Sequence, residues 1–190
     1  MSREDRRASL LDSAAALVDE LGAGALTFEA LASAAEVASS LPYAYFDSKE
    51  DILLTLFDRV IGALDEQVRS VVLDDASEYR TIVREAIDVW FDAAREHGRL
   101  LGALLDGGSV PGLRAAVAQR DRASHKLWHD LVADRFALDD KDAHVLAAML
   151  NHTATATVEL WLRRKGSRRD LTDAFVIMAA GAAKALEQSR

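Results

Sequence analysis

The stretch that decides the fold runs from Thr27 to Lys49 and reads Thr-Phe-Glu-Ala-Leu-Ala-Ser-Ala-Ala-Glu-Val-Ala-Ser-Ser-Leu-Pro-Tyr-Ala-Tyr-Phe-Asp-Ser-Lys. Its first half repeats apolar residues at helical spacing, on a face formed by Phe28, Leu31, Ala32 and Ala35. Thr27 stands just before this face, where its hydroxyl can accept a hydrogen bond from a free backbone N–H. The sequence therefore predicts a short helix that begins after Thr27.

A second short helical unit is predicted after a tight turn near residues 36–38. It covers residues 39–46, with two serines first and two tyrosines later. A helix whose N-terminal end is small and uncharged can enter the major groove of DNA closely. Ser48 then predicts the cap of a long helix from Lys49, with Asp51 at its third position. Two short helices joined by a tight turn indicate a helix-turn-helix.

This region resembles the helix-turn-helix of the tetracycline-repressor-like (TetR) family of bacterial regulators. The resemblance rests on Leu31-Ala32, Ala35, Val37, the run Tyr43-Ala-Tyr45-Phe46-Asp-Ser-Lys49-Glu50, and Leu53. It covers roughly the first quarter of the chain, and the rest matches only in length and helicity. It implies an all-α fold, with an N-terminal three-helix DNA-binding domain and a larger C-terminal helical domain for ligand binding and dimerisation.

Two positions depart from the family's usual pattern. Glu36 occupies the turn position where the family usually has glycine. A residue with a side chain must therefore adopt the backbone geometry of this turn. Pro42 lies inside the expected recognition helix, where it removes one helical hydrogen bond. We expect Pro42 to be tolerated because the first turn of a helix has N–H groups without helical partners.

The expected DNA contacts come from this same segment. Ser39, Ser40 and Leu41 are the candidates for base edges or a thymine methyl group. Thr27 and Lys49 each precede or open a helix, where phosphates bind. The resemblance implies that Tyr43 faces the DNA and Tyr45 lies near its backbone. The alternative is that both tyrosines only fill the surface of the small bundle.

Composition limits the class of protein. The chain has 190 residues, half of them apolar, with two prolines and no cysteine. An all-helical protein is expected, and neither disulfides nor thiol chemistry are available. Neither a signal peptide nor an apolar run long enough to span a membrane is apparent, so we expect a cytoplasmic protein without a membrane partner.

Charge is unusual for a DNA-binding protein. The net charge is −8, and the first fifty residues carry four Lys or Arg against nine Asp or Glu, a net −5. A basic patch is the normal footprint of nucleic-acid binding. We therefore expect phosphate contacts through backbone N–H groups and hydroxyls. The basic run at residues 163–169 is interpreted as the complement of a helix dipole and a solvated loop, and a nucleic-acid role is its alternative.

The expected domains are residues 1–48 for DNA binding, with the connecting helix reaching to about 73, and residues 74–190 for ligand binding and dimerisation. The other expected helices cover 4–21, 78–97, 100–106, 113–136, 140–164 and 171–188, with Gly22 and Gly98 as stops, a flexible loop at 107–112, and Asp139 and Asp170 as caps. The last two helices are rich in small residues. They either pack on a second copy around a two-fold axis or complete the core of one chain.

An effector cavity is expected in the larger domain. Its candidate lining residues are Trp90, Leu104, His125, Trp128, His129 and Asn151. The alternative is that the aromatic residues are simply core. His125 and His129 share a helix face as metal ligands can, but a third ligand is not evident, so no metal or cofactor is assigned.

Together with these patterns, the TetR resemblance implies a ligand-responsive DNA-binding transcriptional regulator, a homodimeric repressor released from operator DNA by a small apolar or amphipathic effector. No compact Ser/His/Asp set or carboxylate pair indicates an enzyme. The alternative is a helical dimerisation or adaptor protein that has lost specific DNA binding, which the acidic N-terminal fifty residues, Glu36 and Pro42 favour.

Overall fold

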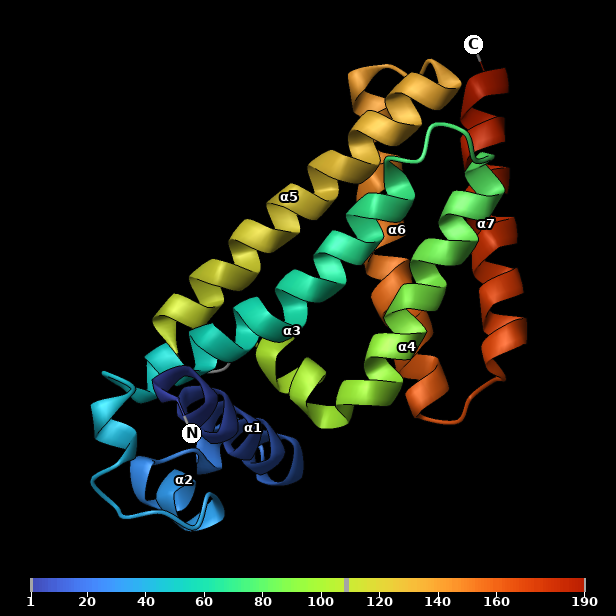
Figure 1. Ribbon diagram of the computed structural model, residues 1–190. Helices are drawn as coiled ribbons and strands as arrows, with labels where there is room; N and C mark the ends of the chain where they lie inside the picture. Colours follow the sequence, from blue (N-terminus) through green and yellow to red (C-terminus); the bar gives the residue numbers. More distant parts are fainter. Residues whose placement is uncertain (1, 108–109, 190) are drawn as a thin grey trace. The chain divides into compact units, whose positions relative to one another are not determined.

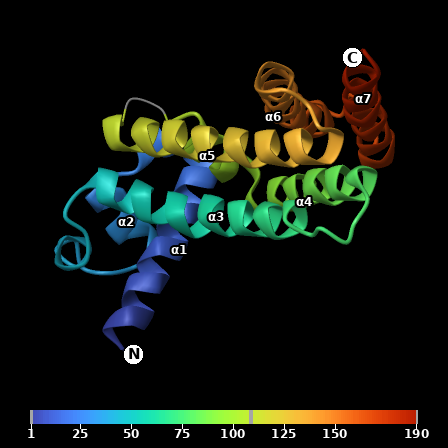
Figure 2. The same ribbon diagram turned by 90° about the horizontal axis from the view of Figure 1, so that it is seen from above.

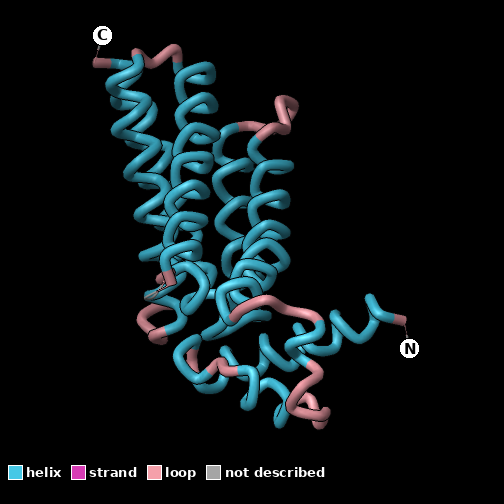
Figure 3. The backbone as a smooth tube through the Cα atoms, turned by 90° about the vertical axis from the view of Figure 1, so that its left-hand side faces the viewer, coloured by secondary structure: helices cyan, strands magenta, loops and turns pink. Residues whose placement is uncertain are grey.

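The fold is all-α, as expected. A computed structural model describes residues 2–107 and 110–189, in which only helices and loops occur (Figures 1 and 3). The elements in order are α1 (Arg3–Leu21), η1 (Ala23–Ala25), α2 (Phe28–Ala34), η2 (Pro42–Ala44), α3 (Lys49–Val72), α4 (Tyr79–Leu105), α5 (Pro111–Phe136), α6 (Asp140–Leu162) and α7 (Arg168–Gln188). Here η denotes a 3₁₀ turn. Among the described helices none is long and apolar enough to cross a membrane.

The chain packs as two compact units that interleave in sequence. The first unit comprises Met1–Ala63 and Glu96–Gln119, and the second comprises Leu64–Arg95 and Arg120–Arg190. Three helices, α3, α4 and α5, therefore contribute residues to both units. The expected functional division into residues 1–48 and 74–190 is sequential, and it stays a prediction.

Each unit has its own apolar core. Buried apolar side chains of the first unit include Leu10, Leu11, Val18, Leu26, Leu31, Ile52, Leu53 and Leu56. Those of the second unit include Ile82, Val83, Ile87, Phe91, Val132, Leu146, Leu150 and Val176. In the second unit α6 and α7 lie side by side along most of their length (Figures 1 and 2).

The helix ends follow local sequence signals. Ser2 and Asp5 form a capping box at the start of α1, and Gly22 ends that helix with φ 83°, donating its N–H to the Val18 carbonyl at 2.8 Å. Ser48 Oγ accepts from the Asp51 N–H at 3.0 Å, which confirms the expected cap of α3. Asp139 caps α6 as expected.

Two expected helix starts are wrong, and the expected end at residue 164 is two residues too late, because α6 ends at Leu162. Ser167, not Asp170, caps α7, because Ser167 Oγ accepts from the Asp170 N–H at 3.1 Å while Asp170 occupies the third helical position. Helix α5 begins at Pro111 rather than Leu113, since the fixed φ of proline suits the first helical position. The expected loop at 107–112 therefore ends earlier, and its residues 108 and 109 lie outside the described residues.

Gly98 interrupts α4 as expected. Its φ of 48° and ψ of −121° are not helical, and the chain resumes a helix at once. A Cβ at this position would lie 3.0 Å from Asp19 Oδ1, so the glycine also permits a close approach to α1 within the first unit.

Candidate nucleic-acid interface

The first helix of the helix-turn-helix forms as its sequence predicts. Thr27 caps α2, with Oγ1 accepting from the Ala30 N–H at 3.0 Å. Leu31 and Ala32 are buried against the core of the first unit. The threonine side chain itself is exposed, which leaves its hydroxyl near the N-terminal end of a helix where an anion is favoured.

The turn after α2 closes without glycine. Glu36 adopts the left-handed conformation itself, with φ 53°. The Val37 N–H donates to the Ala32 carbonyl at 3.0 Å and the Glu36 N–H to the Ser33 carbonyl at 3.2 Å, which is the hydrogen-bond pattern of a Schellman cap. A β-carbon in this conformation costs roughly 1–2 kcal/mol. The departure at Glu36 therefore leaves the turn intact and adds local strain.

The expected recognition helix over residues 39–46 is wrong in its form. Residues 39 and 40 form a turn, and only Pro42–Ala44 are helical, as the single 3₁₀ turn η2. Pro42 has no N–H to donate to a carbonyl four residues back, so the first α-helical bond cannot form. Three-residue bonds replace it, from the Leu41 N–H to Ala38 at 2.9 Å and from the Ala44 N–H to Leu41 at 3.0 Å.

This segment still exposes small polar groups. Ser39 and Ser40 are exposed and Leu41 is half-buried. Pro42 and Phe46 are buried and hold the segment against the core of the first unit. The role of Ser39, Ser40 and Leu41 in contacting bases stays a prediction.

The two tyrosines have different surroundings. The Tyr43 ring is 58% exposed and stacks on Phe28, with ring centroids 4.2 Å apart and planes 16° apart. Its hydroxyl donates to Glu29 Oε1 at 3.3 Å, and partial desolvation together with the Glu29 charge raises the pKa of the Tyr43 hydroxyl. Stacking on α2 fixes the ring in an exposed position, so both the DNA-contact role and the surface-filling role remain compatible with it.

Tyr45 is held by the N-terminal residues of α1. The Arg3 guanidinium lies 5.7 Å from the Tyr45 ring centroid, and its Nη2 donates to the Ala44 carbonyl at 3.4 Å. Arg7 similarly lies over Phe46 at 5.1 Å and donates to Thr55 Oγ1 at 3.1 Å. These supporting roles were not predicted, because contacts over some forty residues of sequence leave no local signal.

Lys49 is partly committed within the protein. Its Nζ donates to the Gly24 carbonyl at 3.3 Å, which ties the start of α3 to the η1 turn. A phosphate contact by Lys49 would therefore add to, or replace, this hydrogen bond. Its DNA-binding role stays a prediction.

Two carboxylates of the first unit cap helices from the later part of the chain. Asp19 Oδ1 accepts from the Leu100 N–H at 2.8 Å, where α4 resumes after Gly98. Glu50 Oε1 accepts from the Gly112 N–H at 2.6 Å, at the start of α5. A Cβ on Gly112 would overlap Glu50 Oε1, so a larger residue at this position would displace the Glu50 carboxylate from the Gly112 N–H. These residues join the helix-turn-helix to residues 96–119.

The sequence comparisons address the same segment. Residues 10–56, from α1 to the first turns of α3, match the family model described as "Bacterial regulatory proteins, tetR family". This segment of the chain is a TetR-family helix-turn-helix domain. The TetR resemblance expected from residues 31–53 is thereby confirmed, and the family is one of regulatory proteins rather than enzymes.

Two curated relatives are similar over part or most of the chain. EthR of Mycobacterium tuberculosis (strain ATCC 25618 / H37Rv), an HTH-type transcriptional regulator, is 31% identical over 97 residues, which cover 50% of this chain and 45% of EthR. FasR of Mycolicibacterium smegmatis, an HTH-type transcriptional activator, is 24% identical over 164 residues, which cover 85% of this chain and 74% of FasR. The match to EthR thus spans about half of each protein.

Solved structures support the fold over nearly the whole chain. A TetR-like transcriptional regulator from Rhodococcus sp. RHA1 has a TM-score of 0.79 at 17% identity, covering 94% of this chain and 96% of the other. AibR, solved in complex with isovaleryl coenzyme A and operator DNA, has a TM-score of 0.70 at 19% identity, covering 91% and 97%. At such identities the likeness shows the TetR-like fold alone.

The expected effector residues are divided between the two units. Leu104 belongs to the first unit, where it is fully buried, whereas the other five belong to the second unit. The Trp90 ring lies beneath the Arg120 guanidinium, 4.9 Å away, and Trp128 is 7% exposed. Both tryptophans have packing roles, and a ligand-binding role for any of the six stays a prediction.

Two polar residues among these candidates, Asn151 and His125, form contacts between α5 and α6. Asn151 Oδ1 accepts from Ser124 Oγ at 2.7 Å, and His125 Nε2 lies 3.0 Å from His144 Nδ1. Burial and the neighbouring imidazoles His144 and His129 lower the pKa of His125. Among the described residues, no three His, Cys, Asp or Glu side chains are already grouped to hold a metal ion.

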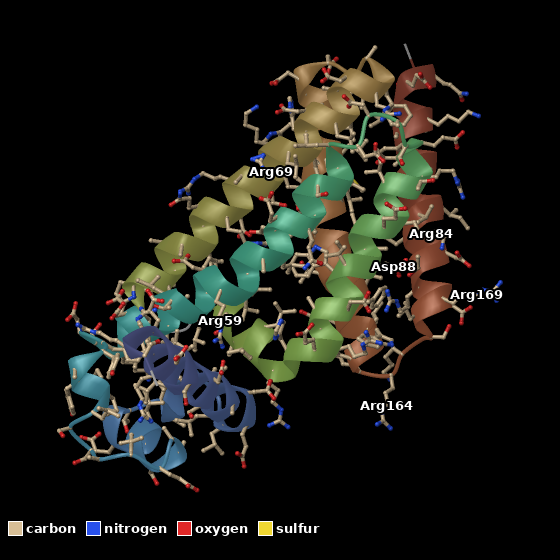
Figure 4. The ribbon with its side chains drawn as sticks, viewed as in Figure 1. Arg59, Arg69, Arg84, Asp88, Arg164 and Arg169 are labelled. Atoms are coloured by element: carbon tan, nitrogen blue, oxygen red, sulfur yellow. The ribbon has the colours of Figure 1, made fainter. Side chains whose placement is uncertain are left out.

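An open cleft of about 510 Å³ lies elsewhere in the second unit. Its lining residues come from the C-terminal end of α3, the loop after it and α5: Arg69, Val72, Leu73, Asp75, Ala123, Lys126, Leu127, Asp130, Leu131, Asp134 and Arg135. None of the six expected effector residues lines it. Its lining combines apolar side chains with charges of both signs, and Arg69 on α3 is one of them (Figure 4).

The basic run at residues 163–169 is largely solvated. Arg164 and Arg169 project away from the loop between α6 and α7 (Figure 4), and the Arg169 side chain is 90% exposed. Arg168 differs, because it pairs with Asp88 at 2.9 Å and with Asp92 at 2.7 Å on α4. The hydrogen bond from Arg168 lowers the pKa of Asp92. Arg168 thus ties the start of α7 to α4, a role that the sequence did not reveal.

Proposed function

We propose that this TetR-family protein is a transcriptional regulator that binds double-stranded operator DNA through residues 27–49. The family match over residues 10–56 carries the proposal, because it covers the helix-turn-helix itself. The exposed Thr27, Ser39, Ser40 and Tyr43 support it, since hydroxyl groups and a rigid ring at a protruding turn suit both phosphate and base contacts.

Few charges support this interface, and that sets its salt dependence. Arg3, Arg7 and Lys49 all contact other groups of the first unit. Each phosphate neutralised by a lysine or arginine contributes about 0.9 to the slope of log affinity against log salt. A surface that relies on backbone N–H groups and hydroxyls therefore predicts a shallow slope for a DNA-binding protein.

A homodimer formed by α6 and α7 completes the proposal. Large apolar side chains are exposed along one face of α6, at Val145, Met149 and Leu160, and on α7 at Ile177, which is 62% exposed. On α7, Gly181 follows Ile177 by one turn, and a Cβ there would meet nothing within 4 Å. Exposed apolar faces of this kind suit burial against a second copy around a two-fold axis. Such a dimer would present two recognition segments to half-sites about 34–36 Å apart.

The proposed effector is a small apolar or amphipathic molecule, and the proposed action is release of a repressor. AibR was solved with an acyl-coenzyme A and operator DNA together, which supports this class of ligand for a protein of the same fold. Helix α3 begins at Lys49 in one unit and ends at Val72 in the other. A displacement of this helix would therefore act on both units. The effector must bind one conformation better than the other to shift DNA binding.

A fluorescence anisotropy titration tests the proposal. The full-length chain is titrated into labelled DNA from upstream of its own gene, at several salt concentrations, with unrelated DNA as control. Saturable binding that is tighter than to the control, and that weakens when acyl-coenzyme A compounds are added, is the expected result. Equal affinity for both DNAs at every salt concentration would contradict operator binding.

A helical adaptor that has lost specific DNA binding is the second candidate. It is favoured by the reduction of the recognition segment to the single turn η2 and by the acidic N-terminal residues. The variants Glu36→Gln and Glu36→Gly separate the candidates. If the chain binds DNA, removal of this charge strengthens operator affinity by a few-fold at low salt in both variants. In an adaptor neither variant creates DNA binding.

A further inference from the structure

The open cleft of the second unit lies between two contacts that join the same two segments. At one end, Arg120 Nε on α5 donates to Asp65 Oδ1 on α3 at 3.0 Å and to its Oδ2 at 3.1 Å. At the other end, Arg135 Nη1 on α5 donates to the Ser77 carbonyl, in the loop after α3, at 3.0 Å. Both segments therefore run in the same direction along the cleft, and the lining residues of each follow the order of the sequence.

The middle of the cleft is apolar. Leu73, Leu127 and Leu131 line it, and Leu73 is 59% exposed. The volume of about 510 Å³ lies within the range of about 300–1,000 Å³ that small-molecule sites occupy. A ligand with an apolar body would remove the Leu73 surface from water, which favours binding.

Charge is divided between the two ends of the cleft. Arg69 lies toward the first end, four residues after the α3 residue of the first contact. Asp75 and Asp134 lie toward the second end, within two residues of the contact there. In the part of the chain that the structure describes, these three side chains form no ion pair, whereas Lys126 in the lining pairs with Asp130 at 2.6 Å.

The second end attracts a cation for a further reason. Asp134 lies in the last turn of α5, which ends at Phe136, and Asp75 lies three residues past the end of α3 at Val72. The C-terminal end of a helix carries about half a negative charge, so carboxylates are unfavourable there. Arg135 supplies one positive charge against these two carboxylates and two helix ends. A bound cation would therefore be stabilised at this end.

We propose that this cleft binds a zwitterion with an apolar body, of the class of a short apolar peptide with free termini. Its carboxylate pairs with the Arg69 guanidinium, since charge-assisted hydrogen bonds of this kind are the stronger ones. Its ammonium group lies at Asp75 and Asp134, and its apolar side chains cover Leu73 and Leu127. The site does not depend on the proposed DNA-binding function.

The length of the cleft suits a ligand of this size. Ala123 and Asp134 line the cleft on α5 and are eleven residues apart, which is about 16 Å along the helix axis. An extended tripeptide spans about 10 Å. The Arg69 and Asp134 side chains extend into the remaining length, so each can meet one terminus of the peptide.

Isothermal titration calorimetry of the full-length chain with the tripeptide Leu-Ala-Leu tests the proposal. Saturable binding with a dissociation constant below about 1 mM is expected. The same peptide with an acetylated N-terminus or an amidated C-terminus should bind about three- to fivefold more weakly, which is the effect of one exposed ion pair. Ser-Gly-Ser, which has both charges but no apolar body, should show no saturable binding.

Variants assign the two ends and the apolar middle. Arg69→Gln should bind the free and the amidated peptide equally, and Asp134→Asn should discriminate less against the acetylated peptide. Ala123→Phe fills the cleft and should abolish saturable binding. Arg122→Gln is the matched control, because Arg122 is also exposed on α5 but does not line the cleft.

Circular dichroism checks that each variant is folded, as expected because the replaced side chains are exposed. The absence of saturable binding of Leu-Ala-Leu to the wild type would overturn the proposal. So would equal affinity of the wild type for the free and the blocked peptides, or an equal loss of affinity in Arg69→Gln and Arg122→Gln.

Discussion

Residues 27–49 of the first unit and the helices α6 and α7 of the second unit expose opposite kinds of surface. The first segment exposes Thr27, Ser39 and Ser40, which are small and uncharged. Helices α6 and α7 expose large apolar side chains such as Met149, which is 51% exposed, and Ile177, which is 62% exposed. Exposed hydroxyls suit a polar partner such as DNA, whereas exposed apolar faces suit a protein surface. One chain therefore exposes a polar surface and an apolar surface that suit different kinds of partner.

The two regions also differ in what holds them. In the first unit Tyr43, Tyr45 and Lys49 each have a hydrogen bond or ring contact that fixes the recognition segment. The family match covers residues 10–56, which include all of these residues except Arg3, the partner of Tyr45. The second unit keeps the fold of solved relatives without close sequence identity. A surface that binds one kind of partner needs particular residues at particular positions. A helical core can be packed by many combinations of apolar residues.

Ile177→Arg is expected to have the largest effect. A charge on the exposed face of α7 opposes burial of that face against a second copy, since an unpaired buried charge is costly. We expect a monomer at micromolar concentration and an operator affinity lower by at least about a hundredfold, since simultaneous engagement of two half-sites is lost. Sedimentation velocity and anisotropy measure the two effects.

Leu73→Arg is the matched control, because Leu73 is similarly exposed, at 59%, but lies outside α6 and α7. It should leave the oligomeric state unchanged. An Ile177→Arg protein that remains dimeric would show that the apolar faces of α6 and α7 are not the interface.

Tyr43→Ala should have the next largest effect, on DNA binding alone. It removes the ring stacked on Phe28 from the exposed side of the recognition segment. We expect operator affinity to fall by about tenfold, equivalent to about 1.4 kcal/mol, measured by anisotropy. Tyr43→Phe keeps the stacked ring and removes only the hydrogen bond to Glu29, so it should lose less. Full affinity in Tyr43→Ala would leave Tyr43 with a surface-filling role.

Asp19→Ala should destabilise the first unit by about 1 kcal/mol, because it leaves the Leu100 N–H without its side-chain acceptor at the start of a helix. Asp12→Ala is the matched control. Asp12 is 71% exposed and pairs with Arg59, also in the first unit, and exposed ion pairs contribute about 0–1 kcal/mol. Urea unfolding measures both, and an equal loss in the two variants would deny Asp19 a capping role.

Asp92→Asn should have the smallest effect, and it should make stability depend less on pH in acid. Arg168 lowers the pKa of Asp92 in the folded state, so the folded protein binds fewer protons near the ordinary pKa than the unfolded chain does. The resulting stability is present above about pH 3.9, the ordinary value, and is lost as the pH falls through the lowered pKa. As the pH falls from 5 to 3, the melting temperature of Asp92→Asn should therefore fall slightly less than that of the wild type. A larger fall in the variant would contradict the predicted direction of this effect.

Much of the local structure could be predicted because its causes are local. Thr27, Ser48 and Asp139 cap the helices that follow them, and Gly22 and Gly98 end or break helices, through hydrogen bonds or dihedral angles within a few residues. The prediction was wrong where two local signals compete. Ser167 and Asp170 can both cap a helix, and the serine does so while the aspartate lies one turn later.

The candidate sites could be predicted only in part. Residues 27–49 were singled out correctly as the helix-turn-helix, but the helical form of residues 39–46 was wrong, because one missing N–H at Pro42 outweighs helical periodicity. The six effector candidates were chosen by residue type, and residue type does not say which side chains meet. The sequence analysis named His125 but not its partner His144, because no spacing rule links residues on different helices.

The sequence by itself determined that this protein is all-helical, where its first helices begin and end, and that residues 27–49 carry a TetR-type helix-turn-helix. These follow from periodicity, caps and a motif, all set by neighbours in the chain. Only the tertiary structure decided that Arg3 supports Tyr45, that Glu50 caps α5, and that His125 meets His144. Such contacts join residues far apart in sequence, and packing of the whole chain fixes them.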